Sequence, residues 1–308
     1  MTALAIDVRH LTKRFGDKAA VEDISLQLPR GEVWGFLGPN GSGKTTTIRM
    51  ICGLLKPTSG EGTCLGYDIL RETDRIKPHV GYMTQKFSFW GDLTIRENLE
   101  FVARLYGLKP RRKIVDDTLA SLGLTHRQHQ LADDLSGGWK QRLALAAVTM
   151  HAPELLLLDE PTAGVDPQAR RDFWDEIHTL ASHGMTILVS THYMDEAERC
   201  DRIAYLAHGH LIAQGTVQDI IDRTGLKTLR GKGDRVRSLA EPIKSVSGVE
   251  HVAYFGAALH VSSRDEQALA QVRQQFSDGV VWEAVPTTLE DAFIALMHEV
   301  GEDRRLTA

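Results

Sequence analysis

One segment near the amino terminus combines three glycines with a lysine and a threonine, and it reads Gly38-Pro39-Asn40-Gly41-Ser42-Gly43-Lys44-Thr45. The apolar run Val33 to Leu37 comes directly before it, and Thr46 to Leu55 has helical spacing. A strand, a glycine-rich loop and a helix therefore follow one another, as in a P-loop. In such a loop the glycines let successive backbone amides point into one concavity, where they hold phosphate oxygens at the start of a helix.

The P-loop predicts a triphosphate with Mg²⁺ as the ligand. Lys44 is expected to reach the β and γ phosphates, and the Thr45 hydroxyl to hold Mg²⁺. A glycine-rich turn with an incidental lysine is the alternative, but the strand and helix on either side disfavour it. The nucleotide-binding residues predicted here are Gly38, Pro39, Asn40, Gly41, Ser42, Gly43, Lys44, Thr45 and Thr46.

Two acidic residues follow a second apolar run. Leu155 to Leu158 reads as a strand buried on both faces, and Asp159 and Glu160 come at its end. P-loop enzymes need a carboxylate at this place to support Mg²⁺, which predicts a metal-binding role for Asp159. Glu160 would polarise the water that attacks the γ-phosphate. Taken alone, the two residues would equally well terminate a strand.

A glycine pair opens another predicted helix, in the segment Leu135-Ser136-Gly137-Gly138-Trp139-Lys140-Gln141-Arg142. Ser136 would cap the helix, and the two glycines would open backbone amides toward an anion. A capped helix start explains the segment equally well in isolation. What distinguishes it is its place in the chain, after the P-loop and Gln85 and before Asp159, Glu160 and His192.

This ordered set resembles the ATP-binding cassette (ABC) family over about residues 4 to 220. The resemblance implies that Phe15 stacks on adenine and that Gln85 contacts Mg²⁺ and senses a membrane subunit. It also implies that Asp166 lies in the D-loop and that His192 contacts the γ-phosphate. On sequence alone Phe15 would equally be a core residue, and Gln85 and His192 surface residues.

By the same resemblance, Ser136, Gly137 and Gly138 form the family signature, and Trp139 departs from it because the family commonly has Gln there. The catalytic residues would be Lys44, Glu160 and His192, and the metal contacts Thr45, Gln85 and Asp159. The signature of one subunit completes the ATP site of another in this family. The chain is therefore expected to pair with a copy of itself or with a closely related nucleotide-binding subunit.

The fold class expected is α/β. Residues 1–222 would form a P-loop NTPase cassette with a RecA-like, mostly parallel sheet, an antiparallel β subdomain and a helical insertion at about residues 88–145. After about Gly215 the sequence texture changes, and residues 223–308 are predicted to form a small α+β accessory domain. This second domain would stabilise a dimer or, alternatively, sense a ligand.

Composition limits the classes of partner. The net charge of −5, from 36 Lys and Arg against 41 Asp and Glu, disfavours nucleic-acid binding. Three dispersed cysteines suggest neither a disulfide framework nor a zinc site. No run of about 18 apolar residues occurs, so if a membrane is involved, another chain would have to span it. The resemblance implies that separate permease subunits are that partner. The expected location is peripheral, at the cytoplasmic face of the inner membrane.

The motifs leave three candidate functions for the chain. A transport ATPase agrees with all the motifs, and residues 286–293 resemble the drug and lipid exporter branch, which points to export. A soluble cassette that remodels ribosomes or DNA would usually carry two cassettes or a long coiled coil. A subunit that binds ATP without hydrolysing it would lack Glu160 or His192, and both are present. Phe87, Phe89 and Trp90 would either dock the membrane partner or pack in the core.

Overall fold

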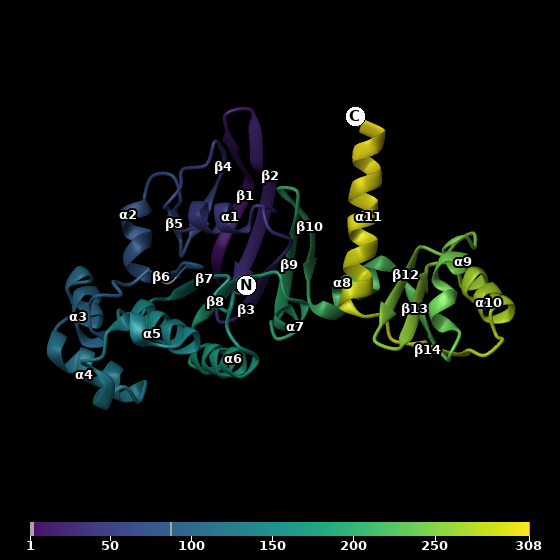
Figure 1. The fold of residues 1–308 in the computed structure, drawn as a ribbon. Coiled ribbons are helices and arrows are strands. Elements are labelled where there is room, and N and C mark those ends of the chain that lie inside the picture. The colour runs from purple at the N-terminus through teal and green to yellow at the C-terminus, as the bar shows by residue number, and fades with distance from the viewer. Residues whose placement is uncertain (1–2, 87, 308) are drawn as a thin grey trace. The chain divides into compact units, whose positions relative to one another are not determined.

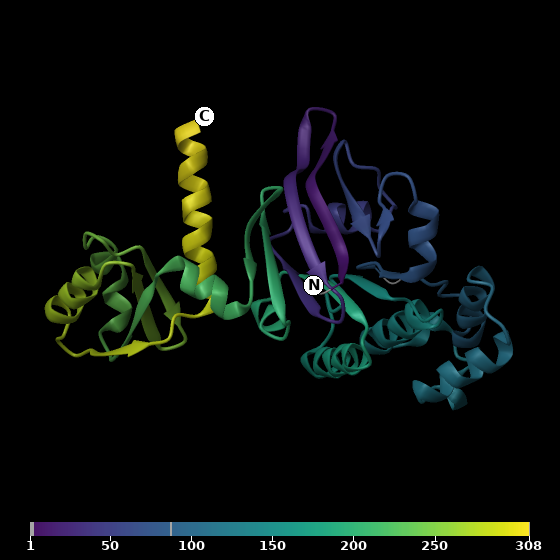
Figure 2. The same ribbon diagram turned by 180° about the vertical axis from the view of Figure 1, so that it is seen from behind.

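The computed structural model describes residues 3–86 and 88–307, and it describes side chains in these ranges up to residue 298. The chain divides into two compact units, Met1–Ile212 and Ala213–Ala308, and Figures 1 and 2 show their elements from opposite sides. Each unit is described by itself. The predicted domain limits at 222 and 223 stay a prediction.

A six-stranded sheet forms the centre of the first unit, in the order β10-β9-β3-β8-β7-β6. Its central strands are short and fully buried because their apolar runs are covered on both faces. The pairs β3/β8, β3/β9, β7/β8 and β6/β7 are parallel. The strands are β3 (Val33–Leu37), β6 (Val80–Met83), β7 (Leu155–Asp159), β8 (Thr186–Thr191), β9 (Arg202–Ala207) and β10 (His210–Gly215).

This topology positions the site. Parallel strands end at the same edge of a sheet, so the segments that follow β3, β7 and β8 meet there. These segments are the glycine-rich loop, Glu160 and His192. Because β8 lies between β3 and β7, its last residues lie between the loop and Glu160.

Two further layers complete the first unit. An antiparallel sheet in the order β2-β1-β4-β5 packs with α1 into one hydrophobic core. Its strands are β1 (Leu4–Phe15), β2 (Lys18–Pro29), β4 (Ser59–Cys64) and β5 (Tyr67–Asp68). A helical region has a core of its own, in which Leu99, Leu119 and Leu143 are fully buried. The α/β class, the antiparallel subdomain and the helical insertion agree with the prediction.

The helices of the first unit are α1 (Lys44–Ile51), α2 (Thr73–Ile76), α3 (Ile95–Leu105), α4 (Arg111–Ser121), α5 (Gly137–Thr149), α6 (Pro167–Ser182) and α7 (Met194–Ala197). Short 3₁₀ turns lie at Lys77–His79, Thr125–Arg127 and Ala132–Asp134. The start of α3 is fixed by a capping box, in which Thr94 accepts from the Glu97 amide and the Glu97 side chain accepts from the Thr94 amide.

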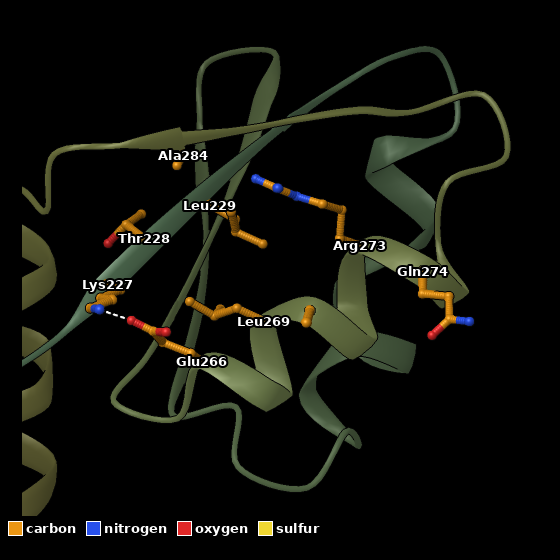
Figure 3. A pocket seen from close by; sticks show the side chains of 9 residues that line it. Lys227, Thr228, Leu229, Glu266, Leu269, Arg273, Gln274 and Ala284 are labelled. Atoms are coloured by element: carbon orange, nitrogen blue, oxygen red, sulfur yellow. Dashed lines mark ion pairs between the residues drawn. The ribbon is translucent and has the colours of Figure 1, made fainter.

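The second unit contains a ferredoxin-like arrangement, with elements in the order β11-α9-β12-β13-α10-β14. Its sheet is antiparallel in the order β12-β13-β11-β14. A pocket of about 450 Å³ lies between α10 and β11. Leu229, Leu269 and Arg273 are among the residues that line it (Figure 3).

The elements of this unit are α8 (Val217–Thr224), β11 (Lys227–Lys232), a 3₁₀ turn (Val236–Ser238), α9 (Ala240–Lys244), β12 (His251–Phe255), β13 (Ala258–Ser263), α10 (Glu266–Gln275), β14 (Val281–Val285) and α11 (Leu289–Thr307). Across both units, within the described residues, no helix is both long enough and apolar enough to cross a membrane.

Candidate nucleotide-binding and catalytic site

The glycine-rich loop joins β3 to α1 and has no room for larger residues at two places. A Cβ at Gly38 would lie 2.1 Å from the Leu206 carbonyl oxygen, and one at Gly43 would lie 2.8 Å from the Ala20 carbonyl oxygen. Gly43 also has φ 105° and is the N-cap of α1. Its lack of a side chain leaves the first amides of the helix without a side-chain cap. Such amides form a site for an anion.

Ser42 supports this assignment. Its side chain is buried, and its Oγ has no hydrogen-bond partner among the described residues. A buried hydroxyl without a partner is costly unless a ligand satisfies it, and a phosphate oxygen at this loop would do so. The other loop residues, Pro39, Asn40 and Gly41, are exposed, and Thr46 lies half-buried in α1.

Lys44 lies folded back on its own loop. Its Nζ donates to the carbonyl oxygens of Gly38, at 2.7 Å, and Pro39, at 3.1 Å. It also lies 3.4 Å from Oε1 of Glu160, with only 4% of the lysine side chain and 9% of the glutamate side chain exposed. Burial lowers the pKa of Lys44, while the Glu160 carboxylate acts in the opposite direction. A buried ammonium is thus held beside the loop, where phosphate charge is predicted.

The Asp159 carboxylate connects the loop to β8. Its Oδ1 accepts hydrogen bonds from Thr45 Oγ1, at 2.9 Å, and from Ser190 Oγ, at 2.8 Å. The residue is 3% exposed. A hydroxyl and a carboxylate oxygen that lie next to each other are hard oxygen donors of the kind that Mg²⁺ prefers. The two predicted metal residues Thr45 and Asp159 are therefore adjacent in the structure.

Glu160 lies at the centre of the predicted catalytic residues. Gln85 Nε2 donates to its Oε2 at 3.0 Å, and Nδ1 of His192 lies 3.3 Å from the same oxygen, within ion-pair distance but without hydrogen-bond geometry. The Glu160 backbone has φ 47°, a left-handed conformation that non-glycine residues rarely adopt. Its amide donates to Ser190 O and Oγ, which hold the strained turn.

The structure brings together Lys44, Thr45, Gln85, Asp159, Glu160 and His192. Phe15 lies elsewhere, at the β1–β2 turn, where it is 55% exposed and Lys13 Nζ lies 5.2 Å from its ring centre. The core alternative for Phe15 is therefore wrong, whereas its stacking on adenine stays a prediction.

The signature residues begin α5. Ser136 and Gly137 are exposed, and Gly138 is buried because α6 passes close by, so that a Cβ at Gly138 would lie 2.5 Å from the Ala169 Cβ. Within the ranges that the structure describes, no hydrogen bond or ion pair joins these three residues to the glycine-rich loop. Asp166 caps α6, because its Oδ1 accepts from the amides of Gln168 and Ala169.

Three further polar residues form hydrogen bonds close to Asp159, Glu160 and His192, and the sequence did not identify them as functional. Ser190 bridges Asp159 and the Glu160 amide, and Thr162 and Thr191 both donate to the buried carboxylate of Glu196. The available signal is weak: Ser190 and Thr191 follow three apolar residues at the carboxyl end of the strand Thr186–Thr191.

The aromatic residues after Gln85 separate in the structure. Phe89 is partly buried and packs against two hydrophobic cores. Trp90 is 46% exposed and contacts Phe101 edge-on, with ring centres 4.4 Å apart. Phe87 lies outside the described residues. Core packing thus applies to Phe89, and a docking role stays open for Trp90.

Comparisons with known proteins identify a family and relatives of this chain. The family model described as ABC transporter matches residues 21–163. The probable multidrug ABC transporter ATP-binding protein YbhF of Escherichia coli (strain K12) is 48% identical over 217 residues, which cover 70% of this chain and 38% of that protein. The chain thus spans well under half of YbhF. Nod factor export ATP-binding protein I of Burkholderia orbicola (strain AU 1054) is 35% identical over 307 residues, covering 98% of this chain and 100% of that protein.

Solved structures give the same result. One described as the ATP binding subunit of an ABC transporter matches with a TM-score of 0.65 and 29% identity, covering 72% of this chain and 93% of that chain. A dimeric ATP-binding cassette in a post-hydrolysis state, bound to ADP and Pi, matches with a TM-score of 0.62 and 27% identity, over 68% of this chain and 98% of that chain. With the whole-length relative and the site geometry, these matches show that the chain belongs to the ABC transporter family.

Proposed function

We propose that this chain hydrolyses Mg²⁺-bound ATP as half of a dimer and thereby drives export through separate membrane-spanning subunits. The observation that supports this best is the group of polar side chains around Glu160, in which Lys44, Gln85 and His192 all lie within 3.4 Å of its carboxylate oxygens. A buried carboxylate with this many polar neighbours beside a P-loop is suited to act on a water molecule.

Each residue of the group has a role in this proposal. Lys44 would exchange the carbonyl oxygens of its own loop for the β and γ phosphates, which carry more charge. Glu160 would then accept the proton of the attacking water, and His192 would contact the γ-phosphate. Gln85 would fix the orientation of the Glu160 carboxylate through its amide. Catalysis would rest on positioning and electrostatics.

The Mg²⁺ ion would be held by Thr45, with Asp159 and Gln85 in support. Thr45 Oγ1 donates to Asp159 Oδ1 at 2.9 Å, so the two groups lie next to each other beside the loop. The ion would supply positive charge that offsets the charge of the triphosphate.

Replacement of Glu160 by Gln tests the hydrolytic role. The amide keeps the shape but cannot accept a proton, so we expect phosphate release to fall by roughly a hundredfold or more, the lower range of general-base effects. Binding of a fluorescent ATP analogue should remain, because Lys44 and the loop amides are intact. The assay is phosphate release alongside nucleotide titration, and wild-type turnover in Glu160→Gln would refute the assigned role.

The exposed signature supports dimerisation. Ser136 and Gly137 are exposed at the start of α5, and within the described residues no hydrogen bond joins them to the glycine-rich loop of their own chain. A second subunit with its signature against this loop, and its loop against this signature, would enclose two ATP molecules. The partner would be an identical copy or a related nucleotide-binding subunit.

Substitutions of two adjacent glycines test dimerisation and folding separately. A Cβ at Gly137 meets nothing within 4 Å, whereas one at Gly138 clashes with Ala169. In the Glu160→Gln background, we expect Gly137→Ala to keep the thermal stability and to lose ATP-dependent dimerisation, measured by light scattering. Gly138→Ala should lower the melting temperature, because overpacking costs about 1–3 kcal/mol. An unchanged ATP-dependent dimer of the Gly137→Ala variant would contradict a signature that acts across the interface.

A membrane partner is supported by exposed apolar side chains on the first unit. Leu54 and Leu105 are 53% and 70% exposed, and Leu54 lines a groove of about 280 Å³ with Tyr82 and Tyr106. Exposed apolar patches of this kind mark interaction sites. We place the chain at the cytoplasmic face of the inner membrane, with this surface against the permease.

Export is the direction that the relatives favour. Their names include multidrug transport, linearmycin resistance and Nod factor export. The Nod factor relative matches along the whole chain, so its match extends over the second unit as well. The substrate itself would be selected by the membrane subunits.

Charge reversal of the apolar surface tests the docking. We expect Leu54→Glu and Leu105→Glu to abolish co-purification of a multi-span protein from detergent-solubilised membranes, because a buried unpaired charge is costly. Their ATPase activity without the partner should be unchanged. Val281→Glu is the matched control, because Val281 is 75% exposed in the second unit. Equal recovery of the membrane protein with all three variants would exclude this surface.

A further inference from the structure

Glu196 is a buried carboxylate without a role in the site described so far. It lies in the short helix α7, four residues after His192, and is 1% exposed. Glutamate is almost never fully buried unless it is paired, because its desolvation costs several kcal/mol. The groups that contact the Glu196 carboxylate must offset this desolvation cost, so they indicate the role of the residue.

Both carboxylate oxygens of Glu196 are used, and each holds a different segment. Oε1 accepts a hydrogen bond from Thr162 Oγ1 at 2.5 Å, and Oε2 accepts one from Thr191 Oγ1 at 2.6 Å. Arg170 Nε, from α6, lies 3.5 Å from Oε1 and forms an ion pair. The carboxylate thus joins three segments that are far apart in sequence.

Two of these segments carry the catalytic residues. Thr162 comes two residues after Glu160, and Thr191 comes directly before His192. The Thr191 hydroxyl is further fixed because its oxygen accepts from the Tyr193 amide at 3.0 Å, on the other side of His192. Glu196 therefore fixes the backbone on the carboxyl side of Glu160 and on the amino side of His192.

The distance between the two catalytic side chains depends on this connection. His192 Nδ1 and Glu160 Oε2 lie 3.3 Å apart but lack hydrogen-bond geometry, so their own contact does not fix their relative position. The Glu196 carboxylate supplies a second connection with two short, charge-assisted hydrogen bonds. A displacement of about 1 Å at an active site lowers the rate roughly a hundredfold.

The third segment leads toward the predicted dimer interface. Arg170 lies one turn after the α6 cap Asp166, and its guanidinium carbon stacks 4.2 Å from the centre of the Tyr193 ring. Its neighbour Ala169 is the residue that packs closest to the signature Gly138. If the segment between Glu160 and α6 changed its conformation, Thr162 and Arg170 would move with it, and their contacts with Glu196 would change.

We propose that Glu196 is a positioning residue for ATP hydrolysis, which holds Glu160 and His192 at a fixed separation through Thr162 and Thr191. The proposal rests on the hydrolytic function proposed above. Glu196 acts through its neighbours and does not contact the nucleotide. It should affect kcat, and it should leave nucleotide affinity nearly unchanged because, among the described residues, its carboxylate has no hydrogen bond or ion pair to Lys44 or the glycine-rich loop.

The test uses the full chain and compares kcat with the dissociation constant of a fluorescent ATP analogue. In Glu196→Gln one oxygen becomes an amide nitrogen that cannot accept from the second threonine. We expect kcat to fall about tenfold or more, the effect of losing a hydrogen bond to a charged group. The dissociation constant should change by less than about twofold. A variant that loses binding as much as turnover would overturn the proposal.

Matched threonine variants keep the test valid if Glu196→Gln folds poorly. Thr162→Ser and Thr191→Ser retain the donor and should keep wild-type kcat, whereas Thr162→Val and Thr191→Val have the same shape without a donor and should lower it. Melting temperatures of all four check the fold. Serine and valine variants with equal kcat would overturn the proposal.

A double variant separates positioning from general damage. If Glu196 acts through Glu160, then Glu196→Gln should have little further effect on the residual single-turnover rate of Glu160→Gln. An equal loss in both backgrounds would show a structural role only. Absence of turnover in the wild-type dimer would instead contradict the proposed function, so the two failures are distinguishable.

Discussion

The buried contact between Lys44 and Glu160 connects the glycine-rich loop to the end of β7, and the rest of the site is arranged around it. An ammonium and a carboxylate that are both over nine-tenths buried stabilise each other only if their remaining polar atoms are satisfied. Lys44 meets this condition with two loop carbonyl oxygens, and Glu160 meets it with Gln85. The contact also requires β3 and β7 to end at the same edge of one parallel sheet.

Strand β8 positions the other residues of the site. Because β8 separates β3 from β7, Ser190 is placed to bond both Asp159 and the Glu160 amide, and His192 follows next to Glu160. A triphosphate would compete with Glu160 for Lys44, since it carries more negative charge at the same loop. Nucleotide binding would thereby release the Glu160 carboxylate for the attacking water.

Much of the first unit follows from local patterns. Wholly apolar runs at Val33–Leu37 and Leu155–Leu158 predict buried strands, and the P-loop spacing predicts the loop between β3 and α1. Contacts such as Thr162 to Glu196, 34 residues apart, have no local signal because both residues look like ordinary polar surface residues. In the second unit, β11 has no strand pattern in its sequence. Lys227–Lys232 is basic and contains Gly231, yet it is an inner strand because the Trp282 ring covers that glycine.

On nucleotide binding, Lys44 is expected to leave its loop carbonyls for the γ-phosphate and so to free Glu160. A crystal structure of the wild-type chain with a non-hydrolysable ATP analogue and Mg²⁺ measures this directly. We expect Lys44 Nζ to bond to the γ-phosphate and no longer to the Gly38 oxygen, and Glu160 to face the position of the attacking water. Bound analogue with Lys44 still on Gly38 and Glu160 would contradict it.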